Sequence, residues 1–542
     1  MAFGVLESNS HSQPRGTVLL EDSGQNGMPT ILVPQPSNSR EDPLNMSRLR
    51  KELYFLTIIF GACVTGVLGP VIVPAFGIVA QTFHTSLTHI ALLNGSLVLA
   101  LGVSSYVSSV VSDLWGRRLI FLLTSIMLVI ASIWAAVAQS YESLLAARVF
   151  QGVSMGPFFS LAGTSCVNDV FFLHERGRRV GLWNFAIIVS VNIAPVISGY
   201  LIVDMGWRWA FWFLAVAFGV GLIMVIVFLP ETKYDRREVM QASHVAKPVL
   251  NTEKTDRMAA DEESVPAEQH PDISEASPPC PKWKKFFGLQ YTQYVSAKGL
   301  LPGAYKPFLM LRHPAVLWGC IMWSMTFTWV IVLGAVASQI FGAPPYNLDP
   351  TQVGLVIGIA PLIGSALGTV LSGWMSDMAA RYMSALNGGL YEPEFRLVVI
   401  IPAAITMAVG AFGLAGAIEH AKPTIVCCVF LAFINFGVGA GCTGIVTYTN
   451  DVFLDRAGHA FGLAMVSSLG TRIINTLLTR FSRKLIKSAF AFGLTFMLND
   501  YYASKGPQIF FSTWGGLTLG VCMTTIPLYV FGKRIRCWSE RL

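Results

Sequence analysis

The feature that most constrains this chain is a series of long apolar segments, each about as long as a lipid bilayer is thick. A helix needs about 20 consecutive apolar residues to cross the hydrocarbon core of a bilayer. The clear segments lie at 54–79, 88–111, 119–138, 144–167, 180–203, 208–229, 315–341, 352–375, 397–418, 423–449 and 507–531. A further, interrupted segment lies between Gly458 and Asp500. The sequence therefore predicts an all-α membrane protein with twelve transmembrane helices.

The composition of the chain agrees with this class and excludes others. Hydrophobic residues make up 53% of the 542 positions and charged residues only 13%, whereas a soluble domain carries about 25% charged residues. The basic residues lie in short loops beside apolar segments, so we expect no nucleic-acid partner despite the net charge of +7. The nine cysteines show no metal-binding spacing. We therefore expect a chain embedded in lipid, with neither a metal nor a cofactor.

The distribution of Lys and Arg predicts how the chain is oriented. Basic residues occupy the loops after the second and fourth segments, whereas the loops 81–89 and 139–143 contain neither Lys nor Arg. Basic residues also flank the first segment and follow the last one. Because such residues stay on the cytosolic side, we expect both termini in the cytosol.

Polar stretches divide the chain into regions. Residues 1–50 are rich in Ser, Pro, Asn and Gly, which predicts a disordered cytosolic tail. Residues 232–307 are also polar and predict a cytosolic linker between two six-helix bundles, 51–231 and 308–536. Residues 537–542 then form a short cytosolic tail.

Two sequence landmarks recur in both halves of the chain. SDLWGRR follows the second segment and SDMAAR follows the eighth, with the same spacing from Asp to Arg. The sequence Asn-Asp-Val-Phe directly follows both the fourth and the tenth segments. Matching landmarks in matching places predict two six-helix pseudo-repeats, an architecture in which the halves move around a shared central site.

Several motifs resemble those of the major facilitator superfamily. DLWGRR is similar to its loop signature, and LLAARVFQGVSMG to its R-x-x-Q-G signature, here Arg148, Gln151 and Gly152. NIAPVISGY resembles its antiporter motif, with Ala194 and Ser198 in place of two glycines. PETKYDR and NGGLYEPEFRL resemble the fungal twelve-span drug:proton antiporter branch, near polyamine and cation transporter-like members. The resemblance implies the fold of this superfamily and a proton-coupled transporter of a small organic or cationic solute.

Charged residues at the expected cytosolic junctions are candidates for gating. Carboxylate and guanidinium groups there can form charge-assisted bonds that hold one side of the protein closed. The alternative is that the basic residues only mark the cytosolic side. The candidates are Asp113, Arg117, Arg118, Asp169, Asp377, Arg381 and Asp451.

Arg148 is a different candidate because it lies inside an apolar segment. A buried arginine costs about 2.5–3.5 kcal/mol on insertion scales, so it needs a partner or a cavity. The first segment contains no obvious acid, so its partner should be a carbonyl, Asn94 or another polar group. We predict a role in proton or solute coupling; the alternative is an arginine whose charge reaches the outer membrane surface.

Polar and aromatic residues within the segments are candidates to line a solute cavity, because polar groups in lipid must find partners. They are Asn94, Asn184, Asn192, Trp323, Trp329, Gln339, Asn435 and Tyr448. An aromatic cavity suits an amphipathic or cationic solute. Packing within a bundle is an equally common role for any one of them.

Residues 467–487 interrupt the eleventh expected span with a basic sequence. Each Lys or Arg there would cost about 2.5–3.5 kcal/mol at the centre of a bilayer. Joining Val466 to Ser488 restores one normal span of about 20 residues. The insertion has the length of a small fungal intron, and we hypothesise a retained intron that transcript sequencing would reveal. The alternative is a genuine interfacial insertion.

These patterns predict a secondary active transporter in a cell membrane, most simply the plasma membrane, and a monomer. We expect it to export a small organic solute, a metabolite or drug, in exchange for protons. Proton-coupled uptake of a cation or polyamine is one alternative, and a solute sensor that transports nothing is another. We expect no enzyme, because the spans contain no acid pair, catalytic dyad or metal-binding spacing.

Overall fold

The computed structural model describes residues 18–19, 42–233, 314–452, 493 and 497–539. Ten helices within these ranges are long and apolar enough to cross a membrane. Helix α5, which contains Arg148, adds a further helix of 20 residues. The expected eleventh span and its insertion, 467–487, lie outside the described residues. The all-helical fold expected from the apolar segments is thus confirmed.

The N-terminal bundle follows the expected spans, with one break. Its elements are η1 (Pro43–Asn45), α1 (Arg48–Val67), η2 (Pro70–Ala75), α2 (Phe76–Phe83), α3 (Leu87–Trp115), α4 (Arg117–Val137), α5 (Tyr141–Ser160), the π-helical turn η3 (Ala162–Cys166), α6 (Val167–Val170), α7 (Leu173–Met205) and α8 (Trp207–Phe228). The first span is interrupted at η2, which contains Pro70 and Pro74. Proline has no amide hydrogen to donate to the carbonyl one turn earlier, so an α-helix breaks there.

The C-terminal bundle repeats this plan. Its described elements are α12 (Pro314–Phe341), α13 (Pro350–Leu386), β2 (Leu390–Tyr391), η7 (Pro393–Val399), α14 (Ile400–Glu419), α15 (Thr424–Val452), α17 (Leu498–Met523) and α18 (Thr525–Ser539). The last span is longer than the expected 507–531. It turns at Gly506, whose φ of 75° suits a residue without a side chain. It then continues as α18 to Ser539, into the region expected to be a tail.

Two short elements lie within residues 1–50, the region expected to be a tail. Strand β1 (Val18–Leu19) pairs antiparallel with β2 of the C-terminal bundle. Pro43 and Leu44 of η1 are buried, and Lys51 donates a hydrogen bond to the Leu44 carbonyl at 2.9 Å. The sequence analysis did not predict either element, because both are fixed by contacts with distant parts of the chain.

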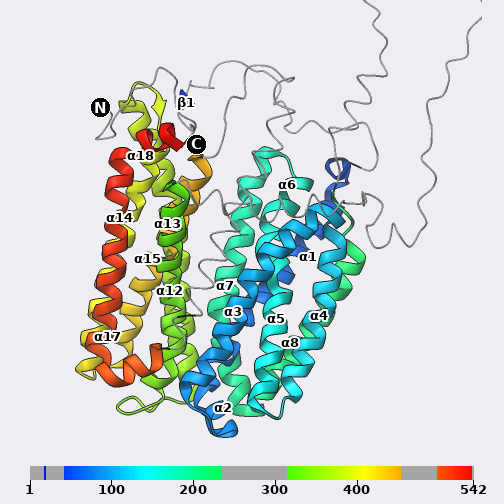
Figure 1. Ribbon diagram of the computed structural model, residues 1–542, viewed down its shortest axis with the longest axis vertical. Helices are drawn as coiled ribbons and strands as arrows, with labels where there is room; N and C mark the ends of the chain where they lie inside the picture. Colours follow the sequence, from blue (N-terminus) through cyan, green and yellow to red (C-terminus); the bar gives the residue numbers. More distant parts are fainter. Residues whose placement is uncertain (1–17, 20–41, 234–313, 453–492, 494–496, 540–542) are drawn as a thin grey trace, which may run out of the picture.

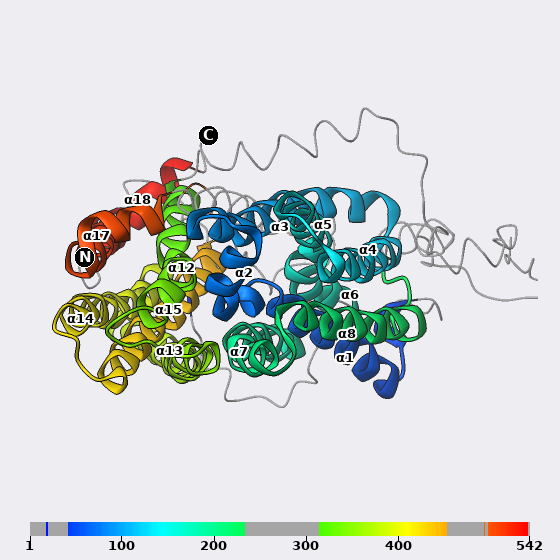
Figure 2. The ribbon, with the colours of Figure 1, turned by 90° about the horizontal axis from the view of Figure 1, so that it is seen from below.

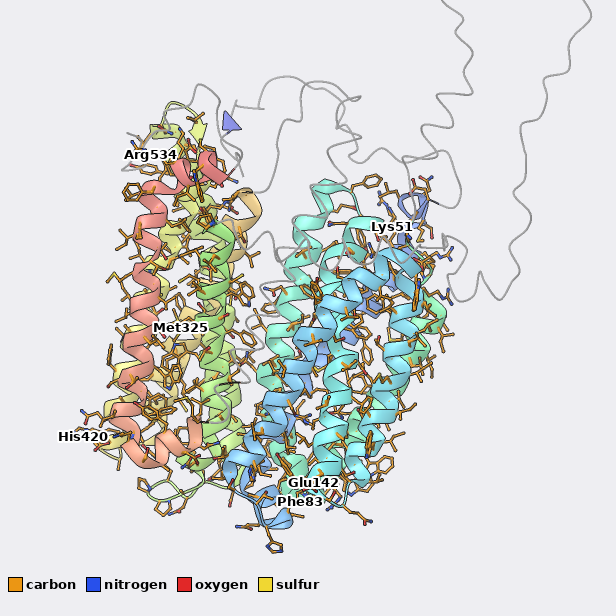
Figure 3. The ribbon with its side chains drawn as sticks, viewed as in Figure 1. Lys51, Phe83, Glu142, Met325, His420 and Arg534 are labelled. Carbon is orange, nitrogen blue, oxygen red and sulfur yellow. The ribbon has the colours of Figure 1, made fainter. Side chains whose placement is uncertain are left out.

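The two bundles stand side by side (Figure 1). Lys51 and Arg534 lie at one end of the molecule, which we call the terminal face, and Phe83, Glu142 and His420 lie at the other, which we call the opposite face (Figure 3). In Figure 1 the two bundles of ribbon approach each other at the opposite face and separate toward the terminal face. Seen from below, α7 and α13 lie next to each other where the bundles meet (Figure 2).

Small residues allow α7 and α13 to pack closely. A β-carbon on Gly354 would overlap with the carbonyl oxygen of Pro195, and one on Gly358 would lie 2.7 Å from the Asn192 carbonyl oxygen. Hydrogen bonds also join the bundles at the opposite face. Thr88 donates to Asp500 at 2.8 Å, and the hydroxyl of Thr351 donates to the Gly199 carbonyl at 3.3 Å. The bundles are therefore in direct contact at the opposite face.

Candidate functional site

Arg148 lies at the centre of the N-terminal bundle and is fully buried. Its guanidinium group donates to the carbonyls of Leu68 at 2.8 Å and Gly69 at 3.4 Å. It also donates to the side-chain oxygens of Gln151, at 3.1 Å, and Asn94. These four partners are all uncharged, so the positive charge is held by dipoles rather than by an acid. The interpretation that Arg148 reaches the membrane surface is wrong, because none of its side chain is exposed.

The local sequence explains why carbonyls are available to Arg148. Leu68 and Gly69 lie between α1 and η2, where the first span changes from α-helical to 3-10 geometry ahead of Pro70. Such a break leaves backbone carbonyls without their usual helical donors. The guanidinium group, which has five donors in a fixed plane, satisfies two of them. The sequence predicted carbonyls or Asn94 as partners, and the structure places both kinds there.

The other two residues of the R-x-x-Q-G sequence fix α5 against its neighbours. Gln151 accepts from Arg148 and donates to Ser132 of α4 at 3.3 Å. A β-carbon on Gly152 would overlap with the carbonyl of Leu97 on α3. This glycine therefore permits the close approach of α3 and α5, and that approach brings Asn94 within reach of Arg148.

A second site lies at the terminal face of the N-terminal bundle. The Nε atom of Arg117, at the start of α4, is 3.4 Å from the carboxylate of Asp169 at the end of α6. Arg117 also donates to Ser112 of α3. Arg118 donates to the Ile226 carbonyl at 3.0 Å. The side chain of Asp113 is outside the described part, although its backbone lies in α3.

Glu231, of the sequence PETKYDR, completes this site, although no role was predicted for it from the sequence. Its carboxylate accepts from the backbone amides of Arg117 and Arg118, at 2.9 and 3.0 Å, and so caps the N-terminus of α4. It accepts in the same way from Thr232 and Lys233. Burial raises the pKa of the Glu231 carboxyl group, and these backbone amides oppose the shift.

Replacing Glu231 with Ala should destabilise the protein by about 1–3 kcal/mol, because buried amides would lose their acceptor. Glu231→Gln should cost less than about 1 kcal/mol, since an amide oxygen still accepts from the backbone amides. Stability should fall as the pH rises from the ordinary glutamate pKa through the raised one, and Glu231→Gln should abolish that dependence. Thermal unfolding in detergent at several pH values measures both effects. Glu142→Ala, at an exposed glutamate of the opposite face, is the control; equal losses in Glu231→Ala and the control would contradict the capping role.

The C-terminal bundle has a matching site. Arg396 of η7 lies 2.5 Å from the carboxylate of Asp451, at the end of α15, and 2.9 Å from that of Asp377. The hydroxyl of Tyr391 donates to Asp451 and accepts from Arg396 at 2.8 Å. Asp169 and Asp451 are repeat-related, and each pairs with an arginine at the start of the third span of its own bundle. Of the other gating candidates in this half, Asp377 pairs with Arg396, and Arg381 is exposed on α13.

A buried ion cluster beside this site was missed by the sequence analysis. Arg536 of α18 donates to Glu394 at 2.8 and 2.9 Å and to Glu392 at 2.8 Å. Lys533 lies 2.8 Å from Glu392. Arg536, Glu392 and Glu394 are all at most 3% exposed. The sequence contains a weak signal, because two glutamates beside a proline precede a long apolar span and three cations follow the last one.

The pairs Arg117–Asp169 and Arg396–Asp451 each lie inside one bundle, and each uses the aspartate of an Asn-Asp-Val-Phe sequence. A family model described as the Major Facilitator Superfamily matches residues 54–476. The chain belongs to the Major Facilitator Superfamily. It is therefore a membrane transporter of this type and not an enzyme.

Members of the superfamily resemble this chain over most of its length. An MFS-type transporter of Schizosaccharomyces pombe is 24% identical, over 99% of this chain and 92% of the relative. A probable efflux pump of Aspergillus flavus is 22% identical, over 85% of this chain and 98% of the pump. The crystal structure of a D-xylose–proton symporter superposes with a TM-score of 0.57 at 15% identity, covering 88% of this chain and 97% of that one. This last likeness shows the fold alone.

The superfamily fold places the predicted cavity residues in different environments. Asn94 binds Arg148, and Asn192 donates to Ser365 across the bundle contact at 3.3 Å. Trp329 donates to Thr518 inside the C-terminal bundle at 3.0 Å. The remaining candidates were placed as follows: Tyr448 is buried with its ring 5.5 Å from that of Trp318, Asn435 donates to the Leu431 carbonyl at 2.9 Å, Trp323 and Gln339 are half-buried, and Asn184 is exposed. Packing thus accounts for Trp329, Asn435 and Tyr448, while Asn94 and Asn192 lie where helices or bundles meet.

Proposed function

We propose that this protein exports a small organic solute from the cytosol in exchange for protons by alternating access. The observation that carries the proposal is the fully buried, acid-free site of Arg148 at the break in the first span. The membrane is proposed to be the plasma membrane, with the terminal face in the cytosol and the protein a monomer. The resemblance of the motifs to a drug:proton antiporter branch and the name of the A. flavus efflux pump support export.

The site of Arg148 is suited to transmit movement between the bundles. Its carbonyl partners, Leu68 and Gly69, directly precede η2, and η2 contacts α12 and α13 of the other bundle. A displacement of the C-terminal bundle would therefore move the carbonyls that hold the guanidinium charge. An arginine does not release its proton in proteins, so Arg148 is proposed to act through its fixed charge and not as the proton carrier.

The bundle contacts are consistent with a state that is closed at the opposite face. With the terminal face in the cytosol, the arrangement in Figure 1 corresponds to an inward-facing transporter. The ion pairs at the terminal face, Arg117–Asp169 and Arg396–Asp451, keep each bundle rigid while the two move as bodies. We therefore propose that these charged residues, expected to hold one side of the protein closed, instead stabilise each bundle internally.

The experiment that tests this function is solute flux in proteoliposomes with an imposed pH gradient, using a panel of neutral, anionic and cationic amphipathic compounds. Export coupled to protons predicts flux that reverses with the gradient. Within the described spans, no Asp or Glu lies in the middle of a helix, which weighs against a polyamine as solute. Flux of a polyamine alone would favour the uptake alternative, and binding without flux would favour a sensor. Flux that does not depend on the pH gradient would contradict the proposed coupling to protons.

A bulky residue at Gly354 should prevent closure of the opposite face. Gly354→Leu would place a side chain against the Pro195 carbonyl, so we expect a shift toward the outward-facing state and at least about a tenfold loss of flux, equivalent to about 1.4 kcal/mol. Gly373→Leu, on the same helix with open space around it, is the matched control. The distance between spin labels at Val203 and Gln352 should increase in the first variant only; unchanged distances in both would contradict the mechanism.

A further inference from the structure

The two bundles also meet at the opposite face through the first part of α17, residues 498–505, which we call the closing segment. The closing segment belongs to the C-terminal bundle and contacts the start of α3 in the N-terminal bundle. Thr88 of α3 donates to the carboxylate of Asp500 at 2.8 Å. The side-chain amide of Asn499 donates to the Leu87 carbonyl at 3.4 Å. Two neighbouring polar residues of one bundle therefore hold the end of a helix in the other.

The closing segment is tied to the rest of α17 by aromatic side chains. The hydroxyl of Tyr501 lies 3.1 Å from that of Thr513, farther along the helix. The ring of Tyr502 packs edge-on against Phe510, with 5.4 Å between the ring centroids, and Phe510 is fully buried. A movement of the C-terminal bundle away from α3 would therefore carry the closing segment with it.

Asn499 makes this contact costly to close. The residue is only 3% exposed, and its side-chain oxygen has no hydrogen-bond partner among the described residues. In water an amide oxygen accepts hydrogen bonds from the solvent, so burying it without a donor raises the free energy of the closed contact. Asp500, the next residue, is exposed, so water reaches this end of the helix. Separation from α3 would return the Asn499 amide to water, and the cost therefore falls on the closed state.

Asp500 acts in the opposite direction. Its carboxylate accepts from Thr88, the second residue of α3. A negative charge is favourable at the N-terminus of a helix, where the backbone amides have no intrahelical acceptor. This interaction exists only while the closing segment lies against α3. Adjacent residues of the closing segment thus favour and oppose closure of the opposite face.

We propose that Asn499 sets the balance between the two states of the transporter by limiting how firmly the opposite face closes. The inference rests on the alternating access of the proposed function. Its unpaired oxygen keeps the closed and open states within about tenfold of each other in population. A firmly closed opposite face would hold the protein in one state and slow each transport cycle. Asn499 is therefore a positioning residue, which acts through the contact between bundles and not through the solute.

The test is the distance between spin labels at Val203 and Gln352, which lie at the opposite face in different bundles, in the full-length protein in lipid nanodiscs. The parent protein should show both a short and a long distance. Asn499→Leu replaces the amide with an apolar group of similar size and should shift the ratio at least about fivefold toward the short distance. Gln508→Leu makes a similar change at an exposed position of α17 and should behave as the parent protein.

Two further measurements separate this role from packing. Asp500→Ala removes the acceptor of Thr88 and should shift the ratio about twofold toward the long distance. Asn499→Leu should lower solute flux while its thermal midpoint stays equal to or above that of the parent, because an unpaired buried oxygen is removed.

A parent protein that shows only the short distance would overturn the proposal. So would an Asn499→Leu variant with the same distance ratio as Gln508→Leu. The distances require neither a solute nor a pH gradient, so they test this inference even if flux proves independent of protons.

Discussion

Arg148→Ala is expected to reduce proton-driven solute flux at least about a hundredfold. The guanidinium group makes several charge-assisted hydrogen bonds to Leu68, Gly69 and Asn94, and each such bond contributes about 1.5–3 kcal/mol. Loss of two of them where the conformational change occurs amounts to about 3 kcal/mol, which corresponds to roughly a hundredfold in rate. Flux in proteoliposomes, normalised to the amount of reconstituted protein, is the measurement.

The stability of Arg148→Ala should change far less than its flux. Removing the side chain leaves buried acceptors unpaired, which costs about 1–3 kcal/mol. It also removes the penalty of about 2.5–3.5 kcal/mol for a charge in the membrane. The two effects oppose each other, so the thermal midpoint should shift by only a few degrees. A variant with normal stability and no flux would separate a coupling role from a packing role.

Two further variants sharpen this test. Arg148→Lys keeps the charge but can reach fewer of the acceptors, so we expect partial flux. Arg208→Ala removes another arginine of the same bundle, which donates to the Ala138 carbonyl at the opposite face, and should retain most of the flux. Full proton-coupled flux in Arg148→Ala would contradict a coupling role and would show that the side chain is only structural.

Much of the fold could be read from the sequence because a bilayer imposes one length and one polarity on every span. The predicted span boundaries were wrong where proline or glycine interrupts a helix. Pro70 and Pro74 break the first span, and Gly506 turns the chain before the last one. Both features depend on backbone geometry within a few residues. The contact between the Leu68 carbonyl, at the break in the first span, and Arg148, 80 positions away, depends on how the helices pack.

The candidate site was predicted in part for the same reason. A lone arginine in an apolar segment must find a polar partner. Arg148 and Asn94 could therefore be identified from the free-energy cost of placing an unpaired charge in the membrane. The pairing of Arg396 with Asp451, and the cap made by Glu231, could not. These contacts join charges at the ends of different spans. Most span ends at the terminal face carry charged residues, so many pairings are compatible with the sequence.

The ion cluster around Arg536 should be the most sensitive point for stability in the described part of the C-terminal bundle. Arg536→Met removes the cation shared by Glu392 and Glu394, which are buried almost completely. Breaking a buried ion pair by removing one partner costs about 3–5 kcal/mol, because the remaining charge stays in a low-dielectric site. We expect a large fall in the thermal midpoint in detergent, and a reduced yield of folded protein.

The size of this effect should depend on the unpaired charges and not on the lost side chain. Combining Arg536→Met with Glu392→Gln and Glu394→Gln removes the charges together, and should recover most of the stability because a neutral replacement of a buried ion network is often tolerated. Lys533→Met, which removes a more exposed partner of Glu392, should cost less than Arg536→Met, because Arg536 still neutralises the buried glutamates. If the triple variant is no more stable than Arg536→Met, the cost lies in packing of α18 against η7, and the electrostatic explanation fails.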